Sequence, residues 1–195
     1  GGGNLTLEGT AVTSEAGDVL LQATGDVTLA AARDTASSSS KTTSTSRGFL
    51  SSSTTTTQTS QSSDTAKVTE LVAAQGISIS AGNNVNSVGT QFKAEDGVAI
   101  QADGIVNVDA ALSISSSSSS SDSSSFFGIN SSESQKKTNT QKYTSSLIDA
   151  NNIAINGKTV AFTGTDLDAE SVSLTYDKLI LNTTKNMANT SNYAD

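Results

Sequence analysis

The chain has 195 residues, of which 34% are hydrophobic and 4% aromatic, so it holds fewer apolar side chains than the roughly 45–50% of a typical globular domain. Its net charge of −8, with only 11 lysine and arginine residues, argues against a nucleic-acid partner, because no basic surface is available to neutralise phosphates. Cysteine and histidine are absent, which excludes the usual zinc and iron–sulfur sites and any Ser–His or Cys–His catalytic pair.

The first thirty residues repeat the five-residue motif Gly-(Asn/Asp)-apolar-x-apolar, in which x stands for any residue. The motif occurs at residues 3–7, 17–21 and 25–29. Alternation of apolar and other residues over four or five positions, bounded by Gly and Asn, is typical of short half-buried strands. The spacing does not fit an amphipathic helix. We therefore predict short β-strands.

Residues 36–66 form a tract made almost entirely of serine and threonine, interrupted once by Arg47-Gly48-Phe49-Leu50. Threonine has good strand propensity, and glycine suits a tight turn. We therefore predict a long β-hairpin whose tip lies at this interruption. A flexible serine-rich linker is the alternative that the composition leaves open.

Looser copies of the short motif occur at residues 76–79, 97–100 and 104–108. Their spacing is regular, because Ile77 to Val98 and Val85 to Val106 are equal intervals. A period of about 20 residues with two or three short strands suits one coil of a parallel β-helix. Such a solenoid also suits a chain with few apolar residues, since each inward side chain stacks on its equivalent in the next coil.

A second serine-rich tract occupies residues 113–146 and is interrupted by Phe126-Phe127-Gly128-Ile129-Asn130. We predict a second hairpin here by the same argument. Beyond it the short period returns, because Ile153 to Val172 and Val160 to Leu179 are again equal intervals, slightly shorter than the earlier ones.

A longer repeat, of about 75–80 residues, is superimposed on the short one. Residues 16–29 align with 95–108, and residues 71–79 align with 147–155. Each long repeat contains one serine-rich tract of about 33 residues. The remaining residues of the repeat, about 46, are enough for two coils. Two coils advance ~9.6 Å, and a two-stranded hairpin spans the same ~9.6 Å. Hairpins of adjacent repeats of the chain are therefore expected to pair into one sheet.

The two predicted hairpin tips carry the large apolar residues Phe49, Leu50, Phe126, Phe127 and Ile129. Exposed apolar clusters usually mark contact surfaces, so these residues are candidates for contact with a membrane interface or a receptor. The alternative is that they pack on the neighbouring tip. The basic run Lys136, Lys137 and Lys142 is interpreted as a solvated face.

Metal and enzyme sites are poorly supported. The corner aspartates Asp18, Asp26, Asp96 and Asp103 suggest calcium, but the calcium-binding nonapeptide pattern is not reproduced, and turn aspartates commonly bond to backbone groups. A polysaccharide-cleaving site would need paired carboxylates beside aromatic residues, which are few here. We therefore expect no catalytic residue, cofactor, metal or small-molecule substrate.

No stretch approaches the ~20 apolar residues of a transmembrane helix, and the start at Gly1-Gly2-Gly3-Asn4 has no signal-peptide features. We expect residues 1–195 to be a single β-helix segment of a longer exoprotein, with insertions at about 36–66 and 113–146.

The coils with Gly-(Asn/Asp)-apolar-x-apolar motifs, interrupted by serine-rich tracts with Gly and Phe, resemble the hemagglutinin repeats of two-partner-secretion exoproteins. These include the filamentous hemagglutinins and the contact-dependent growth inhibition effectors of the CdiA type. The resemblance covers essentially the whole chain. It implies a right-handed parallel β-helix, secreted by a Gram-negative bacterium and displayed at the cell surface.

For function, the resemblance implies a non-enzymatic repeat module. As in the growth-inhibition effectors, the module would act as a filament shaft and as a contact and translocation element, at the outer membrane or a receptor of a neighbouring bacterium, during delivery of a C-terminal toxin. The alternative is a passive adhesin segment, as in the filamentous hemagglutinins. We expect neither the secretion activity nor the toxin activity of such exoproteins in these residues.

Overall fold

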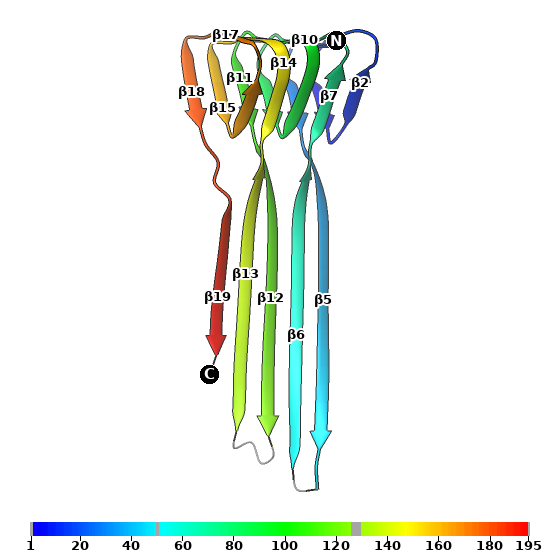
Figure 1. The fold of residues 1–195 in the computed structure, drawn as a ribbon, viewed down its shortest axis with the longest axis vertical. Coiled ribbons are helices and arrows are strands. Elements are labelled where there is room, and N and C mark those ends of the chain that lie inside the picture. Colours follow the sequence, from blue (N-terminus) through cyan, green and yellow to red (C-terminus); the bar gives the residue numbers. More distant parts are fainter. Residues whose placement is uncertain (1, 50, 126–129, 195) are drawn as a thin grey trace. The chain divides into compact units, whose positions relative to one another are not determined.

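The computed structural model describes residues 2–49, 51–125 and 130–194, and the regular elements in these ranges are β-strands (Figure 1). The strands fall into two compact units. The coil unit comprises Gly1–Arg33, Ala66–Leu112 and Tyr143–Lys185. The arm unit comprises Asp34–Thr65, Ser113–Lys142 and Asn186–Asp195.

One sheet of the coil unit contains the first strand of each coil. Its strands pair in parallel, in the order β1-β4-β9-β11-β15-β18. Their bounds are β1 (Leu5–Glu8), β4 (Val27–Ala30), β9 (Val85–Val88), β11 (Ile105–Asp109), β15 (Thr159–Thr163) and β18 (Lys178–Asn182).

The second sheet of the coil unit bends along its length into two columns of parallel strands. The first column consists of β2 (Ala11–Ser14), β7 (Thr69–Ala73), the first half of β10 (Thr90–Ala102), the first half of β14 (Ser146–Asn156) and β16 (Thr165–Asp168). The second consists of β3 (Val19–Ala23), β8 (Gly76–Ala81), the remaining halves of β10 and β14, and β17 (Ser171–Thr175). Three strands per coil with parallel pairing confirm the predicted parallel β-helix.

Inward rows of aliphatic side chains form the core. Val85, Val106 and Val160 are fully buried and stack directly on one another across neighbouring coils. The pairing of Ile77 with Val98 and of Val160 with Leu179 reproduces the intervals predicted from the sequence. Each apolar row therefore fixes the register of the coils that it joins.

The corner between the first and second strands distinguishes odd from even coils. In coils one, three and five the chain turns at Gly9, Gly89 and Gly164, whose φ angles are 54°, 61° and 59°. A Cβ on Gly89 would lie 2.4 Å from the Cβ of Ala111, where the next coil begins its insertion. Positive φ and this close approach together require glycine. In coils two and four the same corner instead leads into the long arm strands.

The arm unit is a five-stranded sheet in the order β19-β13-β12-β6-β5. The strands are β5 (Ala32–Arg47), β6 (Ser52–Lys67), β12 (Ala111–Ser125), β13 (Ser131–Thr144) and β19 (Met187–Ala194). The pairs β6–β12 and β13–β19 are antiparallel. The Thr43 hydroxyl lies 3.3 Å from that of Thr56, and the Thr45 hydroxyl lies 3.4 Å from that of Thr54, so β5 also runs antiparallel to β6.

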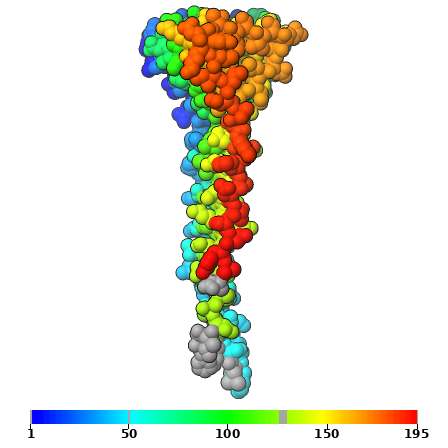
Figure 2. Space-filling model, turned by 90° about the vertical axis from the view of Figure 1, so that its left-hand side faces the viewer, coloured from blue at the N-terminus to red at the C-terminus, as the bar shows by residue number. Residues whose placement is uncertain are grey.

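The antiparallel pairing of this sheet recurs from one pair of arms to the next at similar intervals of sequence. Asp64 of β6 pairs with Ile114 of β12, and Gln141 of β13 pairs with Met187 of β19. The intervals from Asp64 to Gln141 and from Ile114 to Met187 are both close to the long repeat of the coils. Strand β19, which was not predicted from the sequence, therefore takes the position of a first arm and lies along β13 (red in Figure 2).

Candidate functional surfaces

A groove of about 780 Å³ runs along the bend between the two columns of the second sheet. Ala73, Ala94 and Ala150 line the groove and pair in register in successive coils. Ala73 and Ala150 are buried members of the core, so their side chains point inward. The groove therefore follows the backbone at this bend.

Several carboxylates line this groove. Glu15, Glu95 and Glu170 lie where the first column ends, in the first, third and fifth coils. Asp149 and Asp168 pair with each other on the outer face of the first column. All of these side chains are exposed. The groove is acidic and open to water.

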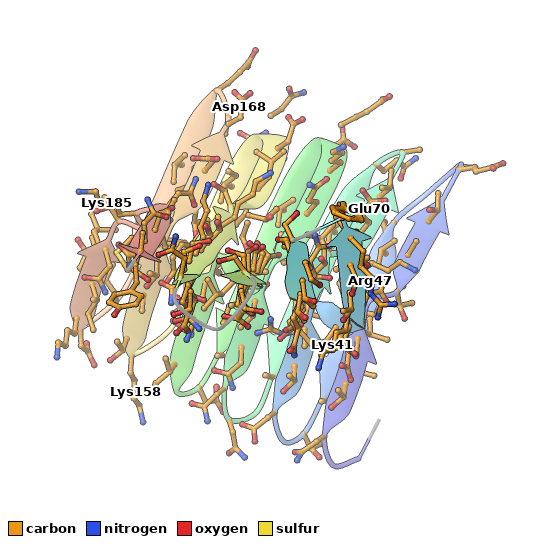
Figure 3. All side chains as sticks on the ribbon, turned by 90° about the horizontal axis from the view of Figure 1, so that it is seen from below. Lys41, Arg47, Glu70, Lys158, Asp168 and Lys185 are labelled. Carbon is orange, nitrogen blue, oxygen red and sulfur yellow. The ribbon has the colours of Figure 1, made fainter. Side chains whose placement is uncertain are left out.

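The basic residues of the coil unit are few along this groove. Lys93 pairs in register with Asp149 and is the cation among the described residues that line it. Figure 3 shows Asp168 and Lys158 pointing away from the coil on opposite sides. A surface of this charge would attract cations and repel anionic polymers.

The sequence contains a signal for the acidic groove that the sequence-based predictions missed. Glu15, Glu95 and Glu170 each stand six positions after the glycine of a Gly-Thr corner. The carboxylates therefore recur once in each long repeat. Only the stacking order of the coils shows that they share one groove.

Two of the four corner aspartates, Asp18 and Asp26, accept hydrogen bonds from the neighbouring coil. Asp18 accepts a hydrogen bond from the N–H of Gly76 at 2.8 Å. One carboxylate oxygen of Asp26 accepts from the backbone N–H of Asn84 at 3.1 Å and from its side-chain amide at 3.0 Å. Within the described ranges, no group of three or more acidic side chains is placed to hold a metal ion. The carboxylates of Asp18 and Asp26 therefore have a structural use at the corners.

The predicted tip residues are only partly described. Phe49 lies just beyond β5 and is 99% exposed, beside a turn in which the N–H of Gly48 donates to the carbonyl of Ser51 at 2.7 Å. Leu50, Phe126, Phe127 and Ile129 lie outside the described residues. The contact role predicted for these five residues stays a prediction.

The three lysines of the second tract lie on β13. Lys136 pairs with Asn192 and Lys137 with Ser191 in the adjoining strand β19. Because successive side chains of a strand alternate, Lys136 and Lys137 point to opposite faces of the sheet. The two lysines therefore belong to different surfaces.

In the part of the chain that the structure describes, no helix has the length and apolar character needed to cross a membrane.

Comparison with known proteins identifies a family. Residues 1–54 and 50–194 match the hemagglutinin repeat family. A protein of Proteus mirabilis named hemolysin is 31% identical over 124 residues, which cover 57% of this chain and 8% of that protein. The chain thus corresponds to a small part of this relative. No solved structure matches the chain. These similarities indicate an adhesin-like repeat segment of a secreted or cell-surface protein.

Proposed function

Because the chain belongs to the hemagglutinin repeat family, we propose that it is a non-enzymatic module that serves as filament shaft and contact element of a large secreted exoprotein. One observation supports this most directly: each long repeat contributes two coils to the coil unit and two strands to the arm unit, and the pairing of arm strands recurs at nearly the length of the repeat. Because every repeat adds the same elements, such a module can be lengthened by adding further repeats.

The shaft role is supported by how the coil unit is held together. Each coil pairs with the coil before it and the coil after it, through parallel backbone ladders and apolar rows. Nearest-neighbour stacking of this kind makes length proportional to the number of repeats, at ~4.8 Å per coil. Such a rod places a terminal domain at a distance from the surface that bears the filament.

The contact role is supported by the exposed surfaces. Phe49 is almost fully exposed, and the arm strands present hydroxyl groups along their length. An apolar tip beside polar strands suits a membrane interface or a receptor pocket. The partner we propose is the outer membrane or a surface receptor of a neighbouring Gram-negative bacterium.

The finer form of the proposal is that contact serves delivery of a C-terminal toxin, as the resemblance to CdiA-type effectors implies. The alternative is passive attachment, which the hemagglutinin character of the family favours. The two differ in the step after contact, since delivery requires transfer of a downstream domain and attachment does not.

Sedimentation with outer-membrane vesicles tests the contact role. We expect the chain to co-sediment with vesicles, and Phe49→Ser to reduce the bound fraction several-fold. Leu20→Ser is the matched control, because Leu20 is also an exposed apolar residue, at 66%, but lies on β3 of the coil unit. Absence of binding by all three proteins would contradict the contact role.

A second experiment separates delivery from attachment. The segment is deleted from the exoprotein that contains it, and cell attachment and transfer of a downstream domain are measured in parallel. Loss of transfer with attachment retained supports delivery. If the deletion abolishes attachment, the failure of transfer follows from the loss of attachment, and the result supports the adhesin role.

A further inference from the structure

The arm unit is a single-layered sheet without a buried core. Its described residues are all exposed or intermediate, and none is buried. Stable domains usually pack two layers of secondary structure around a shared interior. A wide single sheet with both faces open therefore has room for a second layer on each face.

The strand registers assign the side chains to two faces. Ser115, Ser117, Ser119, Ser121 and Ser123 of β12 alternate with their even-numbered neighbours, and side chains that pair across strands share a face. The contact of the Ser123 hydroxyl with that of Ser132 at 2.7 Å extends the assignment to β13. The contact of Thr43 with Thr56 extends it to β5.

One face of β5, β6, β12 and β13 carries small hydroxyl side chains along the middle of the strands, with two exceptions, Gln61 and Lys136; this stretch is called here the hydroxyl face, and it ends before Asp34 and Ala36 of β5 and Lys142 of β13. Its members are Ser38, Ser40, Thr42, Ser44 and Ser46 of β5; Ser53, Thr55, Thr57, Thr59 and Ser63 of β6; Ser115, Ser117, Ser119, Ser121, Ser123 and Ser125 of β12; and Ser132, Ser134, Thr138 and Thr140 of β13.

The opposite face, called here the mixed face, carries five charged side chains over the same stretch of the sheet. Lys41 and Arg47 come from β5 (Figure 3). Asp122 comes from β12, and Glu133 and Lys137 come from β13. The two faces of one sheet therefore differ mainly in charge and in side-chain length.

We propose that the hydroxyl face is an interaction surface for a second copy of this chain, which covers it with the same face. Short side chains allow two sheets to approach closely and interdigitate, as they do in dry interfaces between stacked sheets. Serine and threonine hydroxyls both donate and accept hydrogen bonds, so two like faces can satisfy each other. An interface of this kind is symmetric and closes as a dimer.

The absence of charge favours this face over the mixed face. Covering the mixed face would take Asp122, Glu133, Lys137 and the two β5 cations out of water, which is costly unless each charge finds a well-placed partner. Among the members of the hydroxyl face and its two exceptions, Lys136 is the one charged residue, and the further charges on this side, Asp34, Lys67 and Lys142, lie near the ends of their strands.

The available area is sufficient for a stable dimer. The hydroxyl face comprises runs of about 10 residues, which extend ~33 Å, and four strands ~4.8 Å apart span ~19 Å, so each copy offers ~630 Å². Specific stable interfaces bury roughly 600–1,000 Å² on each partner. The hydroxyl face is therefore large enough without help from the coil unit.

Cysteine cross-linking locates the interface, because the chain has no native cysteine. Single variants of the full chain are made at hydroxyl-face positions (Ser117→Cys, Ser119→Cys, Ser121→Cys) and at mixed-face positions (Ser116→Cys, Ser118→Cys, Ser120→Cys). The variants of each set are mixed, because in a two-fold interface a residue faces its own copy only near the axis. A bismaleimide that spans ~10 Å, the spacing of packed sheets, is expected to link two chains in the odd-numbered set only. Linkage at even-numbered positions, at both sets or at neither would overturn the proposal.

Lysine exchange tests the energetic argument by sedimentation equilibrium. Ser121→Lys, on the hydroxyl face, is expected to raise the dimer dissociation constant at least tenfold, and Ser120→Lys, on the mixed face, less than twofold. Conversely, Lys136→Ser is expected to lower it at least threefold, whereas Lys137→Ser leaves it unchanged. Equal effects within each pair, or a chain that stays monomeric at ~100 μM, a concentration far above the dissociation constants of specific interfaces, would refute the interface.

Discussion

The coil unit and the arm unit consist of the same kind of repeated strand but are stabilised in different ways. In the coil unit, Val, Ile, Leu and Phe side chains stack in closed rows, and many of them are completely buried. In the arm unit no described side chain is buried, and neighbouring strands are joined by backbone ladders and by hydroxyl contacts such as Thr43–Thr56. Regular register therefore does not require an apolar core.

The two units should respond differently to substitution. Burial of apolar surface contributes roughly 25 cal/mol per Å², so the coil unit gains from every inward residue. Cross-strand Thr and Ser pairs contribute roughly 0.2–1 kcal/mol each. Single substitutions should therefore have large effects in the coil unit and small effects in the arm unit.

The largest expected effect comes from removing a core aromatic ring. Phe92 is fully buried and pairs in register with Leu71 and Ile148. Phe92→Ala is expected to lower the free energy of unfolding by about 3–5 kcal/mol, because it removes apolar contacts and leaves a cavity. Urea unfolding followed by circular dichroism measures the change. Phe49→Ala, at an exposed position, is the control, and a comparable loss there would contradict the comparison.

The next largest effect is expected at a coil corner. Gly89 has a φ of 61°, and a side chain there would meet Ala111. Gly89→Ala should cost about 2–4 kcal/mol, since it combines a strained left-handed residue with a steric clash. The midpoint temperature of thermal unfolding measures the change and should be lower in the variant. Gly17→Ala is the matched change, because its added Cβ would come no closer than 3.8 Å to another atom, and a similar fall there would show that the corner argument is wrong.

The smallest effect is expected in the arm unit. A double-mutant cycle with Thr43→Val and Thr56→Val should give a coupling energy of about 0.2–1 kcal/mol, because the two hydroxyls lie 3.3 Å apart. Native-state hydrogen exchange of β5 and β6 measures it locally. A coupling of several kcal/mol would mean that the arm unit has a packed interior after all.

Much of the coil unit was predictable because apolar alternation is a periodic signal. Inward residues such as Ile77 and Val98 have to recur at the coil length, so their spacing alone indicates the register. The link between β4 and β9 was not predictable in this way. Val27 pairs with Val85 across a much longer interval of sequence, because the first tract lies between them.

The arm unit was less predictable for the opposite reason. Odd-numbered and even-numbered positions of the arm strands both hold mainly serine and threonine, so the sequence does not distinguish the two faces of a strand. A shift of the strand pairing by one residue therefore changes the contacts little. Strand β19 is the clearest case. Residues 187–194 carry no strong strand pattern, and they become a strand where β13 offers an unpaired edge.

The order of amino acids alone specifies the parallel coil, its length and the two coils per repeat, because apolar side chains must return to the same row to be buried. Which polar residues share a surface depends on the tertiary structure. The glutamates of the acidic groove and the serines of the hydroxyl face come together because of the order in which coils and strands stack. Solvent-exposed polar side chains carry no burial energy that would encode this order in the sequence.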